Sequence, residues 1–531
     1  MRGQIIRGPP HTSPFPKGER GSHINGNTGS WGGGERDRRR AAAWRRFHSR
    51  HDAHGRSARS ALGSVGGAVI DQALLGPLAA GSGQTRIDQG PRLFDLKLGA
   101  SSEGAPLPRV YGRMRLPGQL IWATRFREEV IVATQTTGGG QAKGGKNLDQ
   151  PSVPQGETVR SIEYRYYANA AYALCEGEIT RVGRIWADGQ ELDQSGLTIR
   201  VYRGDEAQVI DGLIAGKEGG STAAPAYRGT AYVVFENLPL AAFGNRLPQL
   251  NFEVFRAVDD FETLVRAVTL IPSAGEFVYE DDSVIRIAAG QTISENLHTA
   301  QGGTDWKVAI GQLEDQLPNV GHVSLMVSWF GTDLRISHCE IRPGVEVPEK
   351  TTQPYAWSVG GIVREEAYVV SEIDGRPAYG GTPADKAVVS AIRDLKARGF
   401  SVTFYPFISM DVADGNSLPD PYSGATGQPP YPWRGRITCD PAPGVAGSVD
   451  KTAACATQVA SFVGSAAPGD FEISGDTVFY SGPEEWSFRR FILHYAHLCE
   501  AAGGVDAFII GSEMRGATTL RSSASTFPFV D

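Results

Sequence analysis

The stretch Ala384–Ile408, ADKAVVSAIRDLKARGFSVTFYPFI, decides the fold class of this chain. Its first half repeats apolar residues at the spacing of one helix face, and Gly399 ends that pattern. Its second half, from Ser401, is a short run of β-branched and aromatic residues that predicts a buried strand. A helix that leads through a short link into such a strand is the repeating unit of parallel α/β architectures.

The same alternation continues on both sides of this stretch. Buried strands are expected at Val323–Phe330 and Val505–Ile510. Helices are expected near 450–464, at Phe488–Ala502 and from about Asp259. Short links between helices and strands fit either a (β/α) barrel or a doubly wound sheet, and the residues alone leave both open.

The upstream half of the chain has a different pattern. Between Leu93 and Ala257, apolar and polar residues alternate with period two, in runs that include Ser161–Tyr167, Leu197–Tyr202, Tyr232–Phe235 and Leu250–Phe255. This pattern predicts a mostly antiparallel β domain. The chain is therefore expected to be an α+β multidomain protein, with a β-rich domain followed by a parallel α/β domain.

Charge is unevenly distributed along the 531 residues. The net charge is −7, but residues 1–60 carry 12 Arg and 1 Lys against 4 acidic residues. Residues 1–60 show no apolar periodicity, so we expect a basic disordered extension that results from a misassigned start. An arm that binds nucleic acid or anionic lipid is the alternative. Residues 61–85 are expected to form a Gly/Ala-rich linker.

The cysteines and apolar segments exclude several classes of protein. The 5 cysteines include no CxxC pair, so neither a zinc ribbon nor a disulfide framework is indicated, and synthesis in a reducing cytoplasm fits. The apolar segment Ala61–Ala80 is interrupted by Asp71 and Gln72, and no signal peptide opens the chain. No cofactor and no metal are expected, and His494 and His497, three residues apart, are interpreted as packing or solvent-facing residues and not as a metal-binding pair.

Carboxylates follow two of the predicted strands. In barrels and doubly wound sheets, chemistry lies just beyond the carboxyl ends of the strands. Glu513 follows Val505–Ile510 and Asp411 follows Ser401–Ile408. Glycoside hydrolysis needs two carboxyl groups, so Glu513 is predicted as the acid and Asp411 as its partner or as a substrate hydrogen-bond acceptor. The alternative for Glu513 is a structural side chain bonded to Arg515 or to a loop amide.

Aromatic residues near the same strand ends suit sugar binding, because their apolar faces match the C–H faces of sugar rings. Trp329 and Trp433 are the predicted stacking platforms, and Arg434 is predicted to bind substrate beside them.

Two groups of motifs carry a resemblance to known families. The first group resembles the N-terminal region of siphophage tail-tip attachment (host-specificity) proteins: PRVYGRMR at 108–115, ALCEGEI at 173–179 and IWADG at 185–189. The second group resembles the glycoside hydrolase TIM-barrel-like domain of the large baseplate protein of gene transfer agents: FYPF at 404–407, PWRGRIT at 432–438, FILH at 491–494 and FIIGSE at 508–513.

The resemblance implies a component of a phage-like tail baseplate that is made in the cytoplasm and assembled into a particle. Other tail proteins and a cell-wall or surface glycan of the recipient cell are the implied partners, with a homo-oligomer in the tail and no specific nucleic-acid binding. Glu513 falls at the position of the family's strand-end acid. Two functions stay open: a structural and host-interaction protein, or a glycoside hydrolase acting on peptidoglycan or surface polysaccharide.

The resemblance also sets the expected domain bounds. Residues 86–315 are expected to form a β-rich tail-tip or hub-like domain. Residues 316–531 are expected to be the N-terminal part of the TIM-barrel-like domain, truncated and inactive as a hydrolase, because a closed barrel needs eight strands.

Overall fold

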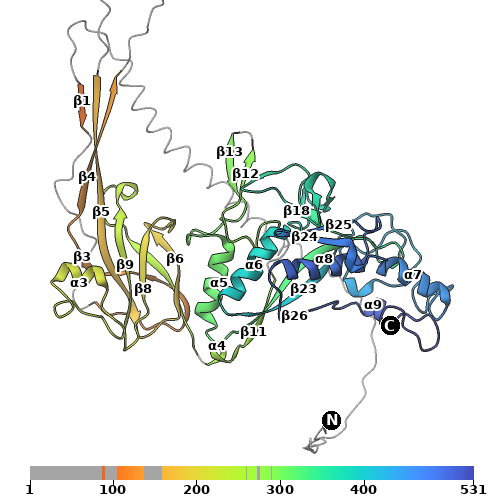
Figure 1. Cartoon of the computed structure of the whole chain (residues 1–531). Coiled ribbons are helices and arrows are strands. Elements are labelled where there is room, and N and C mark those ends of the chain that lie inside the picture. The colour runs from red at the N-terminus through yellow and green to blue at the C-terminus, as the bar shows by residue number, and fades with distance from the viewer. Residues whose placement is uncertain (1–85, 90–104, 137–157, 259, 272–274, 289) are drawn as a thin grey trace, which may run out of the picture. The chain divides into compact units, whose positions relative to one another are not determined.

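The computed structural model describes residues 86–89, 105–136, 158–258, 260–271, 275–288 and 290–531 (Figure 1). The predictions for residues 1–60 and 61–85 lie outside this range. In the part that is described, no helix is long and apolar enough to cross a membrane.

The N-terminal half of the described chain is built from two β-sheets. The larger sheet has the order β1-β5-β9-β8, and β3 and β4 also pair with β5; its strands are β1 (Arg86–Gln89), β3 (Gln119–Ala123), β4 (Arg127–Thr136), β5 (Thr158–Glu176), β8 (Thr198–Tyr202) and β9 (Thr230–Pro239). The smaller sheet has the order β2-β10-β6-β7; its strands are β2 (Gly112–Pro117), β6 (Arg181–Ala187), β7 (Gln190–Glu191) and β10 (Leu250–Arg256). The strand-rich region expected from the alternating pattern is therefore present.

The core of this β-rich region is aromatic. Tyr172, Phe235 and Phe252 are buried, and the rings of Phe235 and Phe252 each lie about 6 Å from that of Tyr172. Two helical turns, α3 (Gly212–Glu218) and a 3-10 turn at Ala241–Phe243, connect its strands.

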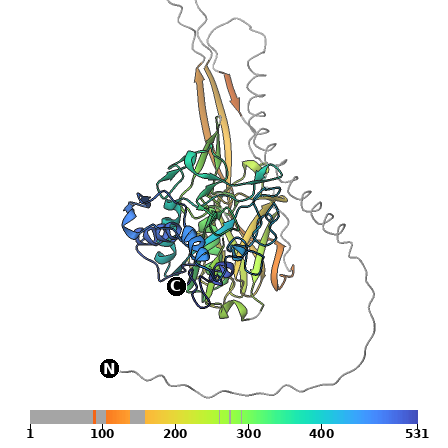
Figure 2. The ribbon, with the colours of Figure 1, turned by 90° about the vertical axis from the view of Figure 1, so that its right-hand side faces the viewer.

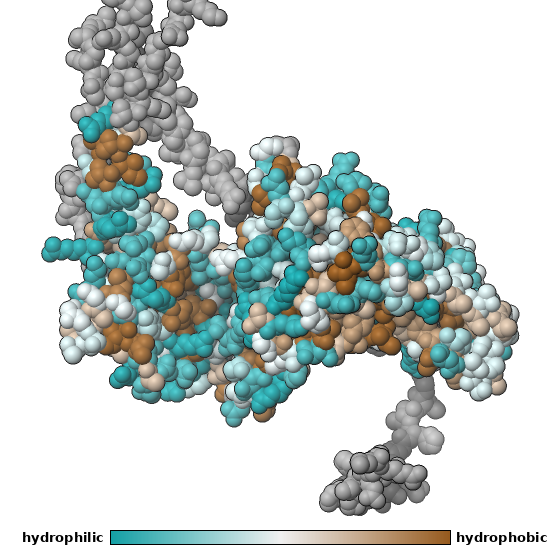
Figure 3. All heavy atoms as spheres, in the orientation of Figure 1, coloured by the Kyte–Doolittle hydropathy of each residue, from teal (hydrophilic) through white to brown (hydrophobic). Residues whose placement is uncertain are grey.

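Strands β4 and β5, with β1 paired to the far end of β5, extend well beyond the other strands of their sheet as a narrow ribbon (Figures 1 and 2). Apolar side chains lie on the surface of this ribbon (Figure 3), where Val130 is 50% and Val132 is 44% exposed. A ribbon this narrow has too few neighbours to cover both of its faces.

The C-terminal half contains a parallel sheet in chain order. Strands β11 (Ala267–Leu270), β14 (His322–Gly331), β23 (Ser401–Met410) and β26 (Ala507–Phe508) lie side by side, and each pair is parallel. The short strand β15 (Ile341–Arg342) pairs antiparallel with the end of β14. Because the strand order follows the chain without reversing, this sheet has the connectivity of a (β/α) barrel wall and not that of a doubly wound sheet.

The first strand of this sheet corrects the expectation of a helix from Asp259. The helix there, α4, spans only Phe261–Leu264, and β11 begins at Ala267. The parallel-sheet core also includes Phe277 and Trp306.

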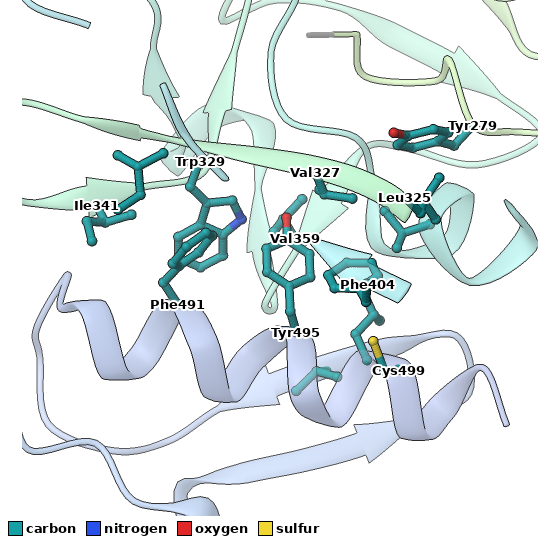
Figure 4. Close-up of a cluster of buried hydrophobic side chains, with 14 of the residues drawn as sticks. Tyr279, Leu325, Val327, Trp329, Ile341, Val359, Phe404, Phe491, Tyr495 and Cys499 are labelled. Atoms are coloured by element: carbon teal, nitrogen blue, oxygen red, sulfur yellow. The ribbon is translucent and has the colours of Figure 1, made fainter. Parts of the chain in front are cut away.

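Helices cover one face of the parallel sheet. They are α5 (Asp305–Gln316), α6 (Asp385–Ala397), α7 (Ala453–Val463) and α8 (Phe488–Ala501), followed by the short α9 (Arg515–Thr518). Phe491 and Tyr495 on α8 pack against Trp329 of β14 and Phe404 of β23 (Figure 4). Mostly apolar strands, such as Val323–Phe330, are thus buried beneath amphipathic helices.

Small hairpins and turns interrupt the connections between these strands and helices. The strands are β12 (Ile285–Ala288), β13 (Gln291–Ser294), β16 (Gly344–Val345), β17 (Thr351–Gln353), β18 (Ser358–Val359), β19 (Ile362–Val363), β20 (Tyr368–Val369), β21 (Glu372–Ile373), β22 (Arg376–Pro377), β24 (Phe471–Ser474) and β25 (Thr477–Tyr480). The 3-10 turns are Arg364–Glu366, Arg434–Arg436 and Pro468–Asp470.

Candidate functional site

The candidate site lies where β23 and β26 end. Along β23, buried side chains alternate with half-buried ones, and Phe404 belongs to the buried set that faces the helices. Tyr405 and Phe407 belong to the other set and lie on the opposite face of the sheet. The loops that follow the two strands bring residues 433–434 and 512–513 to this face.

Arg434 is the centre of the site. Its guanidinium lies 3.6 Å from the ring centroid of Phe407, a cation–π contact. Nη2 donates to Ser512 Oγ at 3.0 Å and lies 2.9 Å from a Glu513 carboxylate oxygen, while Tyr405 OH accepts from the same nitrogen at 3.3 Å. Burial lowers the pKa of Arg434, and the charge of Glu513 acts against that shift.

Glu513 forms an ion pair with the buried Arg434 and is itself exposed to solvent. Its side chain is 54% exposed, and one carboxylate oxygen accepts a hydrogen bond from Trp433 Nε1 at 2.8 Å. The backbone of Glu513 is left-handed, with φ at +55°, which is unfavourable for a residue with a side chain. The predicted alternative, a bond to Arg515 or a loop amide, is not what the structure shows, because its partners are Trp433 and Arg434.

Trp433 is held in place but stays accessible. The residue is 47% exposed while its indole N–H is bonded to Glu513. Its ring packs directly over Gly435, where an added Cβ would lie 2.4 Å from a ring carbon. The backbone at Gly516 also packs closely against that at Ile437, since a Cβ on Gly516 would lie 2.3 Å from the carbonyl oxygen of Ile437.

An apolar groove of about 750 Å³ begins at Glu513. Its walls include Phe488 and Ile492 of α8 and the exposed Ile510. The carboxylate therefore has a buried cation on one side and an apolar surface on the other.

Asp411 is buried and fully engaged by other side chains. One oxygen accepts hydrogen bonds from Tyr368 OH and from the amide of Ser371, both at 2.8 Å, and the other accepts from Ser371 Oγ. Among the described residues, no hydrogen bond or ion pair joins Asp411 to Glu513. These contacts tie the Tyr368–Ser371 loop to the end of β23.

The prediction that Trp329 binds substrate is wrong. Trp329 is 1% exposed and lies between β14 and α8 (Figure 4), with its ring 5.3 Å from that of Phe491. Its place on the helix-facing side of β14 makes it a core residue.

The two histidines of α8 pack against the fold. His494 is buried and its Nε2 lies 3.0 Å from Asp385, whose other oxygen accepts from Gly360 N and Thr477 Oγ1. His497 stacks on Phe471. Both contacts agree with the interpretation of these histidines as packing residues.

A cluster of carboxylates elsewhere has the composition of a cation site but already contains a cation. The ammonium group of Lys350 bonds to Glu276, Glu295 and Glu346, and Arg364 donates to both oxygens of Glu276. The buried Lys350 takes the position that a metal ion would need.

Sequence reasoning missed Tyr405 and Ser512. Tyr405 OH and Ser512 Oγ share a hydrogen bond and both contact Arg434. The alternation of side chains along a strand could have identified Tyr405, because in SVTFYPFI Tyr405 and Phe407 alternate with the residues that face the helices.

Comparison with known proteins agrees with the barrel connectivity. Residues 486–531 match the family described as the GTA TIM-barrel-like domain, where GTA stands for gene transfer agent. No curated protein matches the chain. A chain in a solved virion of a native gene transfer agent particle is 42% identical, over 41% of this chain and 44% of that chain, with a TM-score of 0.24. The match thus spans less than half of that relative.

The family match includes the strand-end segment Phe508–Glu513 on which the resemblance to gene transfer agent proteins was based, and it confirms that resemblance. The chain is thus similar to the gene transfer agent TIM-barrel-like domain over residues 486–531.

Proposed function

We propose that this protein is a structural component of the tail of a gene-transfer-agent-type particle, and that it binds a glycan of the recipient cell at Trp433, Arg434 and Glu513. The match of residues 486–531 to the gene transfer agent TIM-barrel-like domain supports the first part. The β-rich residues then serve to dock the protein onto other tail proteins. Its homo-oligomeric state in the tail stays a prediction.

The arrangement around Trp433 carries the glycan proposal. The indole exposes an apolar ring face while its N–H is fixed on Glu513, so the ring is held ready for stacking with little loss of entropy. A sugar presents C–H groups to such a face and hydroxyl groups at its rim. Glu513, which can only accept hydrogen bonds when ionised, would accept from those hydroxyls.

Glycoside hydrolysis is the second candidate, and Glu513 is the observation in its favour. An unfavourable backbone conformation at a carboxylate is typical of functional positions. Hydrolysis also requires a second carboxyl group about 5 to 10 Å away across the scissile bond. Asp411 has its oxygens engaged by Tyr368 and Ser371, which favours binding over cleavage.

A binding assay tests the proposal. The full chain is incubated with purified peptidoglycan sacculi and, separately, with surface polysaccharide extracted from recipient cells. Trp433→Ala and Glu513→Gln should each weaken binding to one of the two polymers about tenfold or more, because each removes a stacking face or an acceptor. Trp122→Ala is the matched control, since Trp122 donates to Glu218 at 2.7 Å in the same way but lies in the β-rich region.

Two further outcomes decide between the candidates. Release of reducing sugar from either polymer, abolished by Glu513→Gln, would establish the hydrolase. Equal binding by wild type, Trp433→Ala and Glu513→Gln would reject the site. Absence of the protein from purified particles would reject its role in the tail.

A further inference from the structure

Two arginines line the apolar groove beside Glu513 and have no acidic partner. Arg489 in the first turn of α8 and Arg515, which follows Glu513 closely in the chain, are both exposed. Among the described residues, neither guanidinium group forms a hydrogen bond or an ion pair. Arg393, by contrast, is also half exposed and pairs with Asp476 at 2.8 Å. The groove therefore presents two cations that have no carboxylate partner in the described part of the chain.

The start of α8 adds positive potential to the same groove. Phe488 and Arg489 of its first turn line the groove, and this turn contains no acidic residue. The N-terminal end of a helix carries a partial positive charge, because its first amides have no partner within the helix. Glu485, the carboxylate just before the helix, bonds to Ser465 and Ser487 and does not line the groove. An anionic ligand is therefore favoured at this end of the groove.

Glu513 does not offset these charges, because its own charge is matched by another arginine. Its carboxylate lies 2.9 Å from Nη2 of the buried Arg434 and accepts a hydrogen bond from the indole of Trp433. Among the described residues that line the groove, Glu513 is the one that is acidic. With Glu513 and Arg434 paired, the charge that remains is that of Arg489 and Arg515. The groove is thus locally positive on a chain whose net charge is −7.

The walls of the groove limit what an anionic ligand can be. Phe488, Ile492 and Ile510 present apolar surface, and Ile510 is 71% exposed. The C–H faces of sugar rings match such walls, and a carboxylate on the ring can accept two parallel N–H bonds from a guanidinium group. A neutral glycan would cover both arginines without giving either an acceptor, which costs free energy. Carboxylates carried on the sugar rings satisfy the walls and the arginines together.

We propose that the glycan bound at this site is acidic, and that carboxylates on the sugars next to the one stacked on Trp433 bind Arg489 and Arg515. The inference rests on the proposed glycan site and adds the class of glycan that the site selects. Because these ion pairs form at an accessible surface, their contribution falls as the salt concentration rises. A glycan whose charge comes from phosphodiester links is the alternative that the experiment separates.

Chemical modification of one polymer tests the proposal on the full chain. Surface polysaccharide extracted from recipient cells is used in three forms: native, carboxyl-reduced with carbodiimide and borohydride, and dephosphorylated with hydrofluoric acid. Reduction turns each carboxylate into a primary alcohol and leaves the sugar backbone intact. The Kd of each form is measured by biolayer interferometry on immobilised protein. We expect native and dephosphorylated polymer to bind alike, and carboxyl-reduced polymer to bind about tenfold or more weakly.

Single substitutions assign the effect to the groove. Arg489→Gln and Arg515→Gln should each weaken binding of native polymer about two- to fivefold and leave binding of carboxyl-reduced polymer nearly unchanged. Arg376→Gln is the matched control, because it removes an exposed arginine of β22 that does not line the groove, and it should change neither affinity. The basic residues 1–60 are present in every protein, so their attraction for acidic polymer cancels when the affinity ratios of wild type and variant are compared.

Different results would overturn the inference and the site itself. Absence of binding by native polymer, equal binding of native and carboxyl-reduced polymer, loss of binding on dephosphorylation, or wild-type affinity ratios for both arginine variants would overturn the inference. If Trp433→Ala weakens binding of both polymers while the arginine variants leave the ratio unchanged, the glycan site stands and its selectivity for acidic glycans fails. Unchanged binding of every form by Trp433→Ala would reject the glycan site, and this inference with it.

Discussion

At the residue scale, two tryptophans with similar sequence settings have opposite roles. Trp329 and Trp433 both lie near strand ends, yet Trp329 is core and Trp433 is accessible. The run Val323–Phe330 is apolar except for two serines, so its sequence does not show which residues face the helices and which face the opposite side of the sheet. The face that Trp329 occupies therefore cannot be predicted. The carboxylate at 513 and its neighbours 433 and 434 were predictable, because they follow from strand ends and from motif positions.

Gly435 provides a test of the site at this scale. A Cβ at this position would lie within 2.6 Å of three ring carbons of Trp433, so Gly435→Ala should displace the indole from Glu513. Because Trp433 can swing into solvent, the cost in folding free energy should stay below about 3 kcal/mol. The displacement would be measured by fluorine NMR of 5-fluorotryptophan protein, with the Trp433 signal assigned from Trp433→Phe.

The control for this test is Gly216→Ala, where an added Cβ meets nothing within 4 Å. It should leave the Trp433 signal unchanged. A Gly435→Ala protein with the wild-type signal would contradict the packing described for the ring.

At the element scale, single carboxylates join neighbouring strands. Glu253 of β10 accepts from Arg113 of β2 and from Arg184 of β6, so one side chain links three strands of the smaller sheet. Burial alone would raise the pKa of Glu253, but hydrogen bonds from Arg184 and Arg113 outweigh it and lower the pKa to about 2. Such a carboxylate favours the folded state wherever it is ionised.

This arrangement predicts a pH-dependent part of the stability. The folded pKa of Glu253 lies below its ordinary value of 4.5, so its contribution is fully present above pH 4.5 and is lost as the pH falls towards 2. Glu253→Gln should therefore lower the Tm at pH 7, and the difference from wild type should shrink between pH 4.5 and pH 3. Thermal melts followed by circular dichroism would measure it.

The matched control is Glu163→Gln, which removes an exposed partner of Arg165. It should change the Tm little at either pH, because exposed ion pairs contribute little. A difference for Glu253→Gln that is the same at pH 7 and pH 3 would contradict the assignment.

The elements themselves were predictable where they are long. The helix Asp385–Ala397 and the strand Ser401–Met410 follow directly from periodicity. Strand β11 was missed because it has only four residues and follows a helical turn, and two-residue strands such as β16 and β20 have no period to detect. The order of the strands distinguishes a barrel wall from a doubly wound sheet. That order depends on pairing across the sheet and cannot be derived from local sequence patterns.

At the scale of the whole molecule, the described residues contain separate hydrophobic cores. One core unites the parallel sheet with its helices and includes Phe404 and Tyr495. Another lies in the β-rich region and includes Phe235 and Phe252. Each core draws its residues from its own half of the described chain.

Separate cores predict separate unfolding transitions. Phe404→Ala should lower the midpoint temperature of one calorimetric transition and Phe252→Ala that of another, because loss of a buried phenylalanine side chain costs roughly 3–5 kcal/mol of folding free energy. The two variants serve as controls for each other in differential scanning calorimetry. A single transition that both substitutions lower would show that the cores unfold as one unit.

The residues of the candidate site are far apart in the sequence and are therefore synthesised several seconds apart. Trp433 and Glu513 are 80 residues apart, and each gains its hydrogen-bond partner only from the other's loop. At a synthesis rate of about 5–20 residues per second, residue 513 is added roughly 4 to 16 s after residue 433. During that interval the nascent chain already carries β14 and β23 but has no carboxylate to hold the indole. During synthesis the site is therefore completed only once β26 has been added beside β23.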